Sequence, residues 1–202
     1  VEARDSGKFD NEIVPIILED GSILDKDSGP RNPDKEKIKS LKPAFKDDGT
    51  VTAATSSPFS IGASAMLITS EKYAKENGLK IRAYIEGRAV AGVNWTMFGS
   101  GPIPATAKAL KNTGLSMDDI DVVEINEAFA AQALYCIRKA DWDESKVNLN
   151  GGAIALGHPL GISGTRIITT LLNILEQQDK STGLATMCVG TGQGITTIIK
   201  RG

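Results

Sequence analysis

From residue 63 onward, short apolar runs alternate with helix-like segments, and this alternation limits the fold more than any other feature of the chain. Apolar runs of a few residues are typical of buried strands, whereas apolar residues spaced three and four apart are typical of helices. The strand-like runs cover residues 65–69, 80–93, 121–125, 184–189 and 195–199, and the helix-like segments cover 71–77, 104–112, 127–140 and 161–178. This pattern predicts an α/β fold in which helices cover a mixed sheet. The last two runs, joined by GTGQG, are expected to form an antiparallel hairpin.

The first 60 residues are more polar and less regular. Residues 20–34 are rich in Asp, Gly, Ser and Pro, which is typical of an exposed loop. An apolar run at 13–18 has strand character, and residues 33–41 predict a short helix that ends before Pro43. The hydroxyl-rich stretch 50–60, TVTAATSSPFS, is either a plain turn or a loop that donates hydrogen bonds to a ligand.

Composition excludes several classes of function. The chain is 41% hydrophobic and 24% charged, and its net charge of −2 with a pI near 5.5 gives no sign of a nucleic-acid or membrane surface. No apolar run approaches the ~20 residues of a membrane helix. The two cysteines are too few for a disulfide framework or a metal site, so a reducing, cytoplasmic setting is expected. Because the chain begins at Val1 rather than Met, we expect it to be a piece of a longer protein.

Two chemistry-bearing residues follow or end predicted strands, and a third lies in a glycine-rich stretch. Asn126 follows the run 121–125, Cys188 lies at the end of 184–189, and His158, the only histidine, lies in the glycine-rich stretch LNGGAIALGHPLGISGTR. Ligands of α/β sheets gather at the carboxyl ends of strands. A Cys near a His can act as a thiolate base or nucleophile, for which its pKa must be lowered.

The residues beside these three support a catalytic interpretation. Gly190, just after Cys188, exposes a backbone N–H of the kind that an oxyanion hole requires. A lone His or a free Cys is often only a packed residue, and that interpretation suits Cys136 on its helix face. The GTGQG run is not a nucleotide loop, because it joins two strands rather than opening a helix.

Three motifs carry a family resemblance: NEAFA (126–130), GGAIALGHPLGISG (151–164) and CVGTGQG (188–194). In sequence and spacing they closely resemble the C-terminal motifs of thiolases, the acetyl-CoA acetyltransferases and 3-ketoacyl-CoA thiolases. GKFDNEIVPI (7–16), LKPAF (41–45), GTVTA (49–53) and GSGPIPAT (99–106) resemble further stretches of the family. The resemblance covers essentially the whole chain, but only the second half of a thiolase.

The resemblance implies roles for the residues that match. His158 is similar to the histidine that activates the nucleophilic Cys and helps to bind the thioester oxygen. Asn126 resembles the asparagine that holds a water of that oxyanion hole, and Cys188 the second Cys, which moves a proton at the α-carbon. The backbone N–H of Gly190 would serve a second oxyanion hole. The acyl-accepting Cys of the family lies in the first half, outside this chain.

The resemblance also implies that coenzyme A is the substrate or product carrier, with no covalently bound cofactor and no metal. Ser57 falls where the family contacts the pantetheine, and Arg31 is similar, after a one-residue gap, to an arginine near the CoA nucleotide. Phe129 and Met97 match residues that line the pocket. The partners implied are acyl-CoA substrates, the missing N-terminal half and further copies in a homo-oligomer.

The fold implied is the C-terminal half of the family's layered αβαβα architecture, with a mixed five-stranded sheet. Residues 1–60 would be the tail of the CoA-covering loop domain, 61–80 the last strand and helix of the N-terminal domain, and 81–202 the C-terminal domain. Cut off from its neighbours, the strand at 65–69 would show unpaired edges, and the inner helix at 161–178 would expose an apolar face.

Some residues depart from the usual family pattern. The chain has Ala54 to Ser57 where GN and two small residues are usual, Ile61 where Asp is usual, and Thr191 and Gln193 where Gly and Met are usual.

Two alternatives to a thiolase half stay open. One is a non-catalytic thiolase-like fragment that serves as a binding or assembly half. The other is a decarboxylating condensing enzyme, against which the single His argues, because that relative pairs two His with its Cys.

Overall fold

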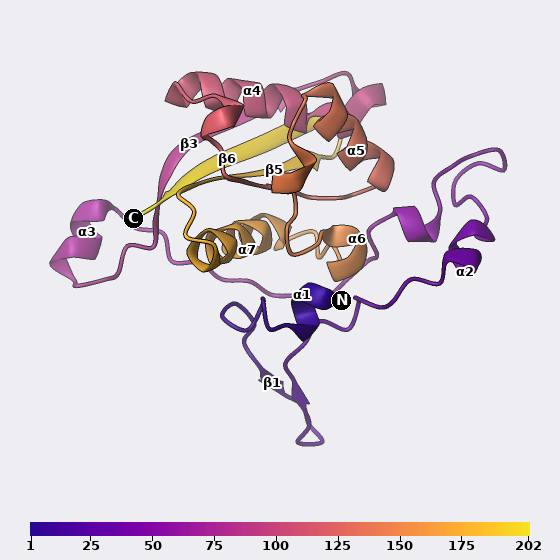
Figure 1. Ribbon diagram of the computed structural model, residues 1–202, viewed down its shortest axis with the longest axis horizontal. Coiled ribbons are helices and arrows are strands. Elements are labelled where there is room, and N and C mark those ends of the chain that lie inside the picture. Colours follow the sequence, from indigo (N-terminus) through magenta and orange to yellow (C-terminus); the bar gives the residue numbers. More distant parts are fainter.

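A computed structural model describes all 202 residues and centres on a mixed four-stranded sheet in the order β3-β6-β5-β4 (Figure 1). β4 pairs in parallel with β5, whereas β6 pairs antiparallel with both β5 and β3. The strands are β3 (Ala83–Gly92), β4 (Val122–Ile125), β5 (Thr182–Val189) and β6 (Gln193–Arg201). The mixed sheet and the predicted hairpin are therefore confirmed.

A single residue pair lies on the outer edge of β4. Val147 forms an isolated parallel bridge with Val123, on the edge of β4 that faces away from β5. The chain then turns at Asn148, whose φ of +48° ends the extended conformation. The expected count of five strands is one too high, because the predicted strand at 65–69 does not join the sheet.

Helices cover both faces of this sheet (Figure 1). α4 and α5 cover one face, and α7 covers the other, where it contacts β4 and β5. The helices are α1 (Glu2–Asp5), α2 (Lys35–Lys39), α3 (Glu71–Glu76), α4 (Pro102–Thr113), α5 (Ala130–Lys139), α6 (Ala153–Leu156) and α7 (Ser163–Gln177). None of them is long and apolar enough to cross a membrane.

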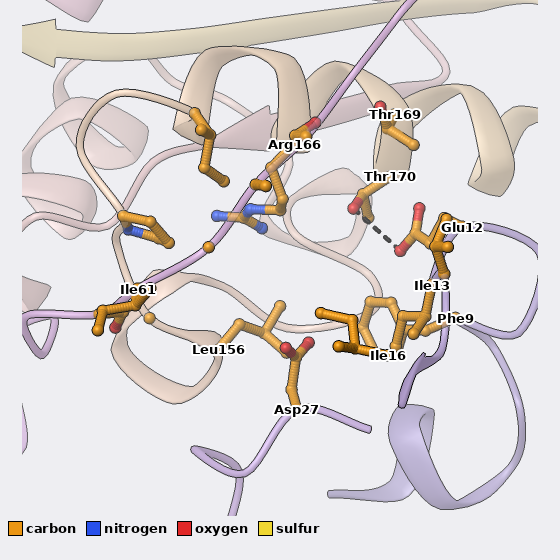
Figure 2. Close-up of a pocket in the computed structure, with 18 of the residues that line it drawn as sticks. Phe9, Glu12, Ile13, Ile16, Asp27, Ile61, Leu156, Arg166, Thr169 and Thr170 are labelled. Carbon is orange, nitrogen blue, oxygen red and sulfur yellow. Dashed lines mark hydrogen bonds between the residues drawn. The ribbon is translucent and has the colours of Figure 1, made fainter. Parts of the chain in front are cut away.

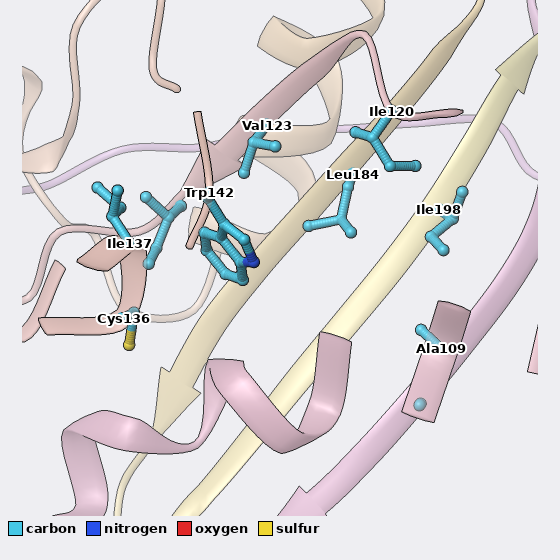
Figure 3. Packing of buried hydrophobic residues seen from close by; sticks show 10 residues of the cluster. Ala109, Ile120, Val123, Cys136, Ile137, Trp142, Leu184 and Ile198 are labelled. Carbon is cyan, nitrogen blue, oxygen red and sulfur yellow. The ribbon is translucent and has the colours of Figure 1, made fainter. Parts of the chain in front are cut away.

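Each face of the sheet has its own apolar core. On the side of α4 and α5, Val123, Leu184 and Ile198 pack with Cys136 and Trp142 (Figure 3). On the side of α7, buried residues of that helix pack against the alternate residues of the same strands: Val122, Ile167, Leu171, Leu172, Ile174, Leu175, Ala185 and Ile199. Alternation of side chains along β4 and β5 therefore divides their residues between the two cores.

Local signals set the helix ends much as expected. Ser70 caps α3, because its hydroxyl accepts a hydrogen bond from the backbone N–H of Tyr73. α4 begins at Pro102, two residues before the predicted start, and ends at Gly114, which adopts the left-handed conformation. The long strand β3 has a bulge between Ile85 and Gly87.

The predicted strand at 65–69 does not form. Residues 61–70 have no regular secondary structure, and Leu67 and Ile68 are exposed. A strand needs a neighbour for its backbone hydrogen bonds, and the four-stranded sheet does not extend to this segment. Among residues 1–60, only the two-residue strands β1 (Ile16–Ile17) and β2 (Ile23–Leu24) pair with each other.

The second half of α7 is more covered than the sequence pattern predicts. The sheet covers one side, and residues near the N-terminus of the chain cover part of the other. Asn173 donates a hydrogen bond to the carbonyl of Lys8, and Thr170 donates one to Glu12. The expected bare apolar face on this helix is therefore wrong for these residues.

Two glycines let α4 approach the sheet. A Cβ at Gly194 on β6 would overlap the backbone of Gly101, and a Cβ at Gly101 would overlap the backbone of Gln193. Backbone therefore lies directly on backbone where α4 begins, a contact that a larger residue cannot replace.

We expect Gly194→Ala to lower the free energy of unfolding by at least about 2 kcal/mol, since neither backbone segment can move without disturbing the sheet. Gly190→Ala in the same hairpin is the matched control, because nothing lies within 4 Å of its added Cβ. The control should leave stability within about 1 kcal/mol of the parent. Urea unfolding of the three proteins measures both effects, and equal stabilities would contradict the packing argument.

Candidate active site

Asn126 and His158 meet at the carboxyl end of β4. The backbone N–H of Asn126 continues the pairing of β4 with β5 by donating to the carbonyl of Thr186 (3.0 Å). Its fully buried side chain donates from Nδ2 to Nε2 of His158 (3.4 Å). Its Oδ1 is buried and has no protein partner. Because a buried amide oxygen favours a hydrogen-bond donor, this atom is suited to hold a water molecule or a substrate group.

Ser163 determines which nitrogen of His158 carries the proton. The Ser163 hydroxyl lies 2.6 Å from Nδ1 of His158 and also donates to the carbonyl of Pro159 (3.0 Å). Since the hydroxyl proton is directed to that carbonyl, Nδ1–H must be the donor to Ser163 Oγ. Nε2 then presents its lone pair to Asn126 and to the space beyond. Partial burial, and secondarily the charge of Arg166, lower the pKa of His158, which keeps the ring neutral near pH 7.

The glycine-rich turn brings a third segment against this pair. Gly157 has a φ of +101°, and an added Cβ there would overlap the Ser60 hydroxyl. The backbone N–H of His158 faces the carbonyl of Pro58 (3.4 Å). Residues 58–60 therefore lie directly on the histidine turn, which a side chain at position 157 would prevent.

Ser57, one of the expected CoA contacts, lies beside the NEAFA segment. Its backbone N–H and its hydroxyl both donate to the carbonyl of Ala128 (3.0 and 3.2 Å). The neighbouring Ser56 forms an isolated bridge with Phe129, whose ring packs edge-on against Phe45 at 6.2 Å between centroids. The structure thus brings Ser57 and Phe129 to the same end of β4 as Asn126 and His158.

Met97 and Arg31 lie on two further segments. Met97 is exposed on a 3₁₀ segment (Trp95–Ser100) that packs against α5 and β5. Arg31 is exposed and makes no side-chain hydrogen bond, and the nearby Gly29 packs tightly against the carbonyl of Ala155 in α6. Neither side chain forms a hydrogen bond with the Asn126–His158 pair, so their assignment to a CoA pocket stays a prediction.

Cys188 ends β5 at the same edge of the sheet, but no hydrogen bond joins it to Asn126 or His158. By strand alternation it shares the face of Leu184, on the side of α5, whereas Asn126 shares the face of Val122. Burial raises the pKa of the Cys188 thiol. Burial in this chain therefore opposes the lowered pKa that a thiolate role requires. A base role for Cys188 stays a prediction, and it requires a partner that stabilises the thiolate.

The turn after Cys188 is strained at one residue. Thr191 has a φ of +68°, in the left-handed region that glycine adopts without steric cost. A glycine at this position would adopt the same conformation without that cost. No side chain crowds Gly190, whose backbone N–H is the predicted donor to an oxyanion.

Comparison with known proteins identifies the family. The family description "Thiolase, C-terminal domain" matches residues 79–201, and "Thiolase, N-terminal domain" matches residues 1–72. The chain belongs to the thiolase family. Part of the N-terminal domain is therefore on this chain.

Individual thiolases show how much of a whole member the chain represents. The 3-ketoacyl-CoA thiolase of Vibrio parahaemolyticus is 55% identical over 96% of this chain and 52% of its own length. The dimeric peroxisomal thiolase of Saccharomyces cerevisiae superposes with a TM-score of 0.94 at 45% identity, covering 100% of this chain and 51% of that one. For human mitochondrial 3-ketoacyl-CoA thiolase in complex with CoA, the TM-score is 0.92 at 39% identity, covering 100% and 51%. This thiolase chain thus spans about half the length of its relatives.

A cavity of about 620 Å³ lies beside the histidine turn of this thiolase chain, on the α7 side (Figure 2). Glu12, Asp27 and Arg166 line it, and one guanidinium nitrogen of Arg166 and one carboxylate oxygen of Glu12 are buried without partners. Sequence patterns do not single out these three residues, because they come together from segments far apart in the chain.

Two buried carboxyls on this side of the sheet have strongly shifted acidities. Burial raises the pKa of Glu124, on β4, to about 8, and that of Glu12 to about 7. Glu124 is 1% exposed and has an unpartnered oxygen. At neutral pH its carboxyl is protonated in the folded state, because the charge of Arg166 offsets only part of the loss of hydration.

These raised pKa values predict that stability falls as pH rises. Between about pH 4.5 and 8, the folded chain keeps protons that the unfolded chain releases, so alkaline conditions favour unfolding. Because one pKa unit corresponds to about 1.4 kcal/mol, Glu124 should lower the free energy of unfolding on the order of 3–4 kcal/mol between pH 5 and pH 8.5. Glu124→Gln should remove this loss of stability. Denaturant unfolding at both pH values measures this. The exposed Glu19→Gln is the control, and an unchanged pH slope in Glu124→Gln would contradict the prediction.

Proposed function

We propose that this chain is the second half of a CoA-dependent acyltransferase that makes or cleaves 3-ketoacyl-CoA by Claisen condensation and thiolysis. The observation that carries the proposal is the Asn126–His158 pair. Ser163 holds the histidine so that Nε2 is unprotonated, and Asn126 lies beside that nitrogen with an unpartnered buried oxygen. A neutral imidazole nitrogen next to a fixed amide suits proton transfer beside an oxygen that becomes negatively charged.

In this proposal His158 acts first as a base. Nε2 takes the proton of a thiol nucleophile, the thiolate attacks the thioester carbonyl, and the CoA thiolate leaves as the acyl group is transferred. His158, now with a proton on Nε2, can then donate to the oxygen of a second bound thioester. A water held by Asn126 would be the other donor to that oxygen. Each such donor contributes roughly 3–4 kcal/mol to transition-state stabilisation.

Cys188 and Gly190 belong to the second step of the proposed reaction. Cys188 would remove the α-proton of the acyl group that condenses and return it in thiolysis, and the N–H of Gly190 would bind the developing oxyanion. Because burial raises the pKa of this thiol, bound substrate or the rest of the protein must supply the field that favours the thiolate. Residues Ser57, Arg31, Phe129 and Met97 would contact CoA, a role supported by the human relative, whose crystal structure is a complex with CoA.

The acyl-accepting nucleophile is proposed to lie outside this chain. Of the two cysteines, Cys136 lies in the core and donates to the carbonyl of Gly99, and burial raises its pKa to about 11. Cys188 is assigned to proton transfer. Neither thiol is therefore suited to accept the acyl group.

The rest of the protein would pack against the segment that bridges the two domains. Residues 65–85 line a second cavity of about 600 Å³ against α7 and β6, and the apolar side chains of Leu67 and Ile68 are exposed nearby. We assign residues 1–60 to the loop domain, 61–80 to the N-terminal domain and 81–202 to the C-terminal domain. Dimeric yeast thiolase supports a homo-oligomer, and a cytoplasmic location stays a prediction.

For activity, we predict that the purified 202-residue chain does not cleave acetoacetyl-CoA, because it has no suitable nucleophile. The protein that joins this chain to the remaining half should be active. Thiolysis followed by the loss of the 3-ketoacyl-CoA absorbance measures both. Ordinary turnover by the chain alone would contradict the assignment of the nucleophile, and an inactive, folded full-length protein would favour a non-catalytic thiolase-like half.

For the division of roles, His158→Ala in the full-length protein should abolish acylation of the nucleophile, because it removes the activating base. Cys188→Ala should permit that acylation yet reduce condensation and thiolysis by at least about 100-fold. Rapid-quench measurement of the acyl-enzyme separates the two steps. Loss of the acylation burst in both variants to the same extent would show that the two residues do not divide the work in this way.

A further inference from the structure

Asn148 completes the outer edge of β4 with both its backbone and its side chain. Its backbone N–H donates to the carbonyl of Val123 (2.8 Å). Its side chain then bonds both backbone groups of Ile125: Oδ1 accepts from the N–H (2.8 Å), and Nδ2 donates to the carbonyl (3.0 Å). One residue thus replaces the strand that would otherwise hold the end of β4, one position before Asn126.

Glu127 connects this edge to the histidine turn. One carboxylate oxygen accepts from Nδ2 of Asn148 (3.1 Å), and the other accepts from the backbone N–H of Ile154 (3.1 Å), in the first turn of α6. Gly152 approaches so closely that an added Cβ would overlap the Glu127 carboxyl. α6 ends at Leu156, and its C-cap residue Gly157 lies directly before His158.

Both neighbours of Asn126 in the chain are therefore fixed. Ile125 is bonded to Asn148, and Glu127 is bonded to Asn148 and to α6. We propose that Glu127 and Asn148 are positioning residues, which set the Asn126–His158 contact by tying the end of β4 to the start of α6. They touch neither reacting group, so they act only through Asn126 and His158. Their effect on catalysis rests on the proposed function, whereas their effect on the contact does not.

The pattern of donors and acceptors makes the Asn148–Glu127 link sensitive to single-atom changes. Both oxygens of Glu127 accept, and the Nδ2 group of Asn148 donates to two oxygens. Glu127→Gln places an N–H₂ group against another donor, whichever way the amide turns. Asn148→Asp places a carboxylate oxygen against the carbonyl of Ile125 and the carboxylate of Glu127. Each change keeps the size of the side chain and removes the match.

The double variant Glu127→Gln with Asn148→Asp tests the link itself. The Gln amide can donate to the Asp carboxylate, while its oxygen still accepts from the N–H of Ile154. Only the repulsion between the Asp carboxylate and the carbonyl of Ile125 remains, so the double variant should recover part of what each single variant loses. A residue pair that acts independently would show no such recovery.

Because the chain has a single histidine, NMR of the 202-residue protein reads the site directly. In the parent we expect cross-relaxation between the Asn126 amide protons and the His158 ring, and ¹⁵N shifts of a ring protonated at Nδ1. Each single variant should weaken the cross-peak at least about twofold and move the ring toward a mixture of tautomers. The double variant should restore both in part, and exposed Glu144→Gln should change neither.

In the full-length enzyme the same variants should lower kcat about 10- to 100-fold while KM for the acyl-CoA stays within about twofold. Inactive parent enzyme would refute the proposed function. The NMR result would still test whether Glu127 and Asn148 set the Asn126–His158 contact. If a single variant fails to fold, Asn148→Gly is used, since glycine keeps the left-handed backbone and removes the side chain. Unchanged cross-peak and ring shifts in folded single variants, or a double variant no better than the worse single one, would overturn the proposal.

Discussion

β4 and β5 run parallel, and most of what the site uses depends on that pairing. Parallel strands end at the same edge of a sheet, so Asn126 and Cys188 reach this edge although they are far apart in the sequence. The backbone of Asn126 continues the pairing by one residue, which removes freedom from its side chain. An antiparallel pairing of the same strands would place one of the two residues at the opposite end of the sheet.

Keeping the site rigid has a cost in buried polar groups. Asn126 is fully buried with an unpartnered oxygen, and Glu124, two residues earlier on the same face, is buried with another. Buried polar atoms without partners cost about 1–3 kcal/mol each. The two apolar cores on either side of the sheet offset this cost, because they pack the strands from both faces.

Local and periodic features could be read from the sequence, and long-range contacts could not. Strand ends and glycine spacing located Asn126 and His158, and Ser70 and Gly114 marked helix ends. The run at 65–69 looks like a strand, but pairing needs a neighbour that this chain does not supply. The raised pKa of Cys188 follows from burial, and the Asn148–Glu127 bonds follow from a turn whose direction no pattern shows. The family resemblance supplied the remaining roles.

The way in which the first 60 residues touch the site also affects the order in which the chain folds. Ser57 bonds Ala128 across 71 residues of sequence, and Thr170 bonds Glu12 across 158. Closing such long loops costs entropy before their contacts offset it, so these contacts form late. The β5–β6 hairpin joins neighbouring segments and can form first, whereas β3 must find β6 across more residues than separate Ser57 from Ala128. The residues near the N-terminus that contact α7 span more of the chain than any strand pair of the sheet, so they are the last to be added to that helix.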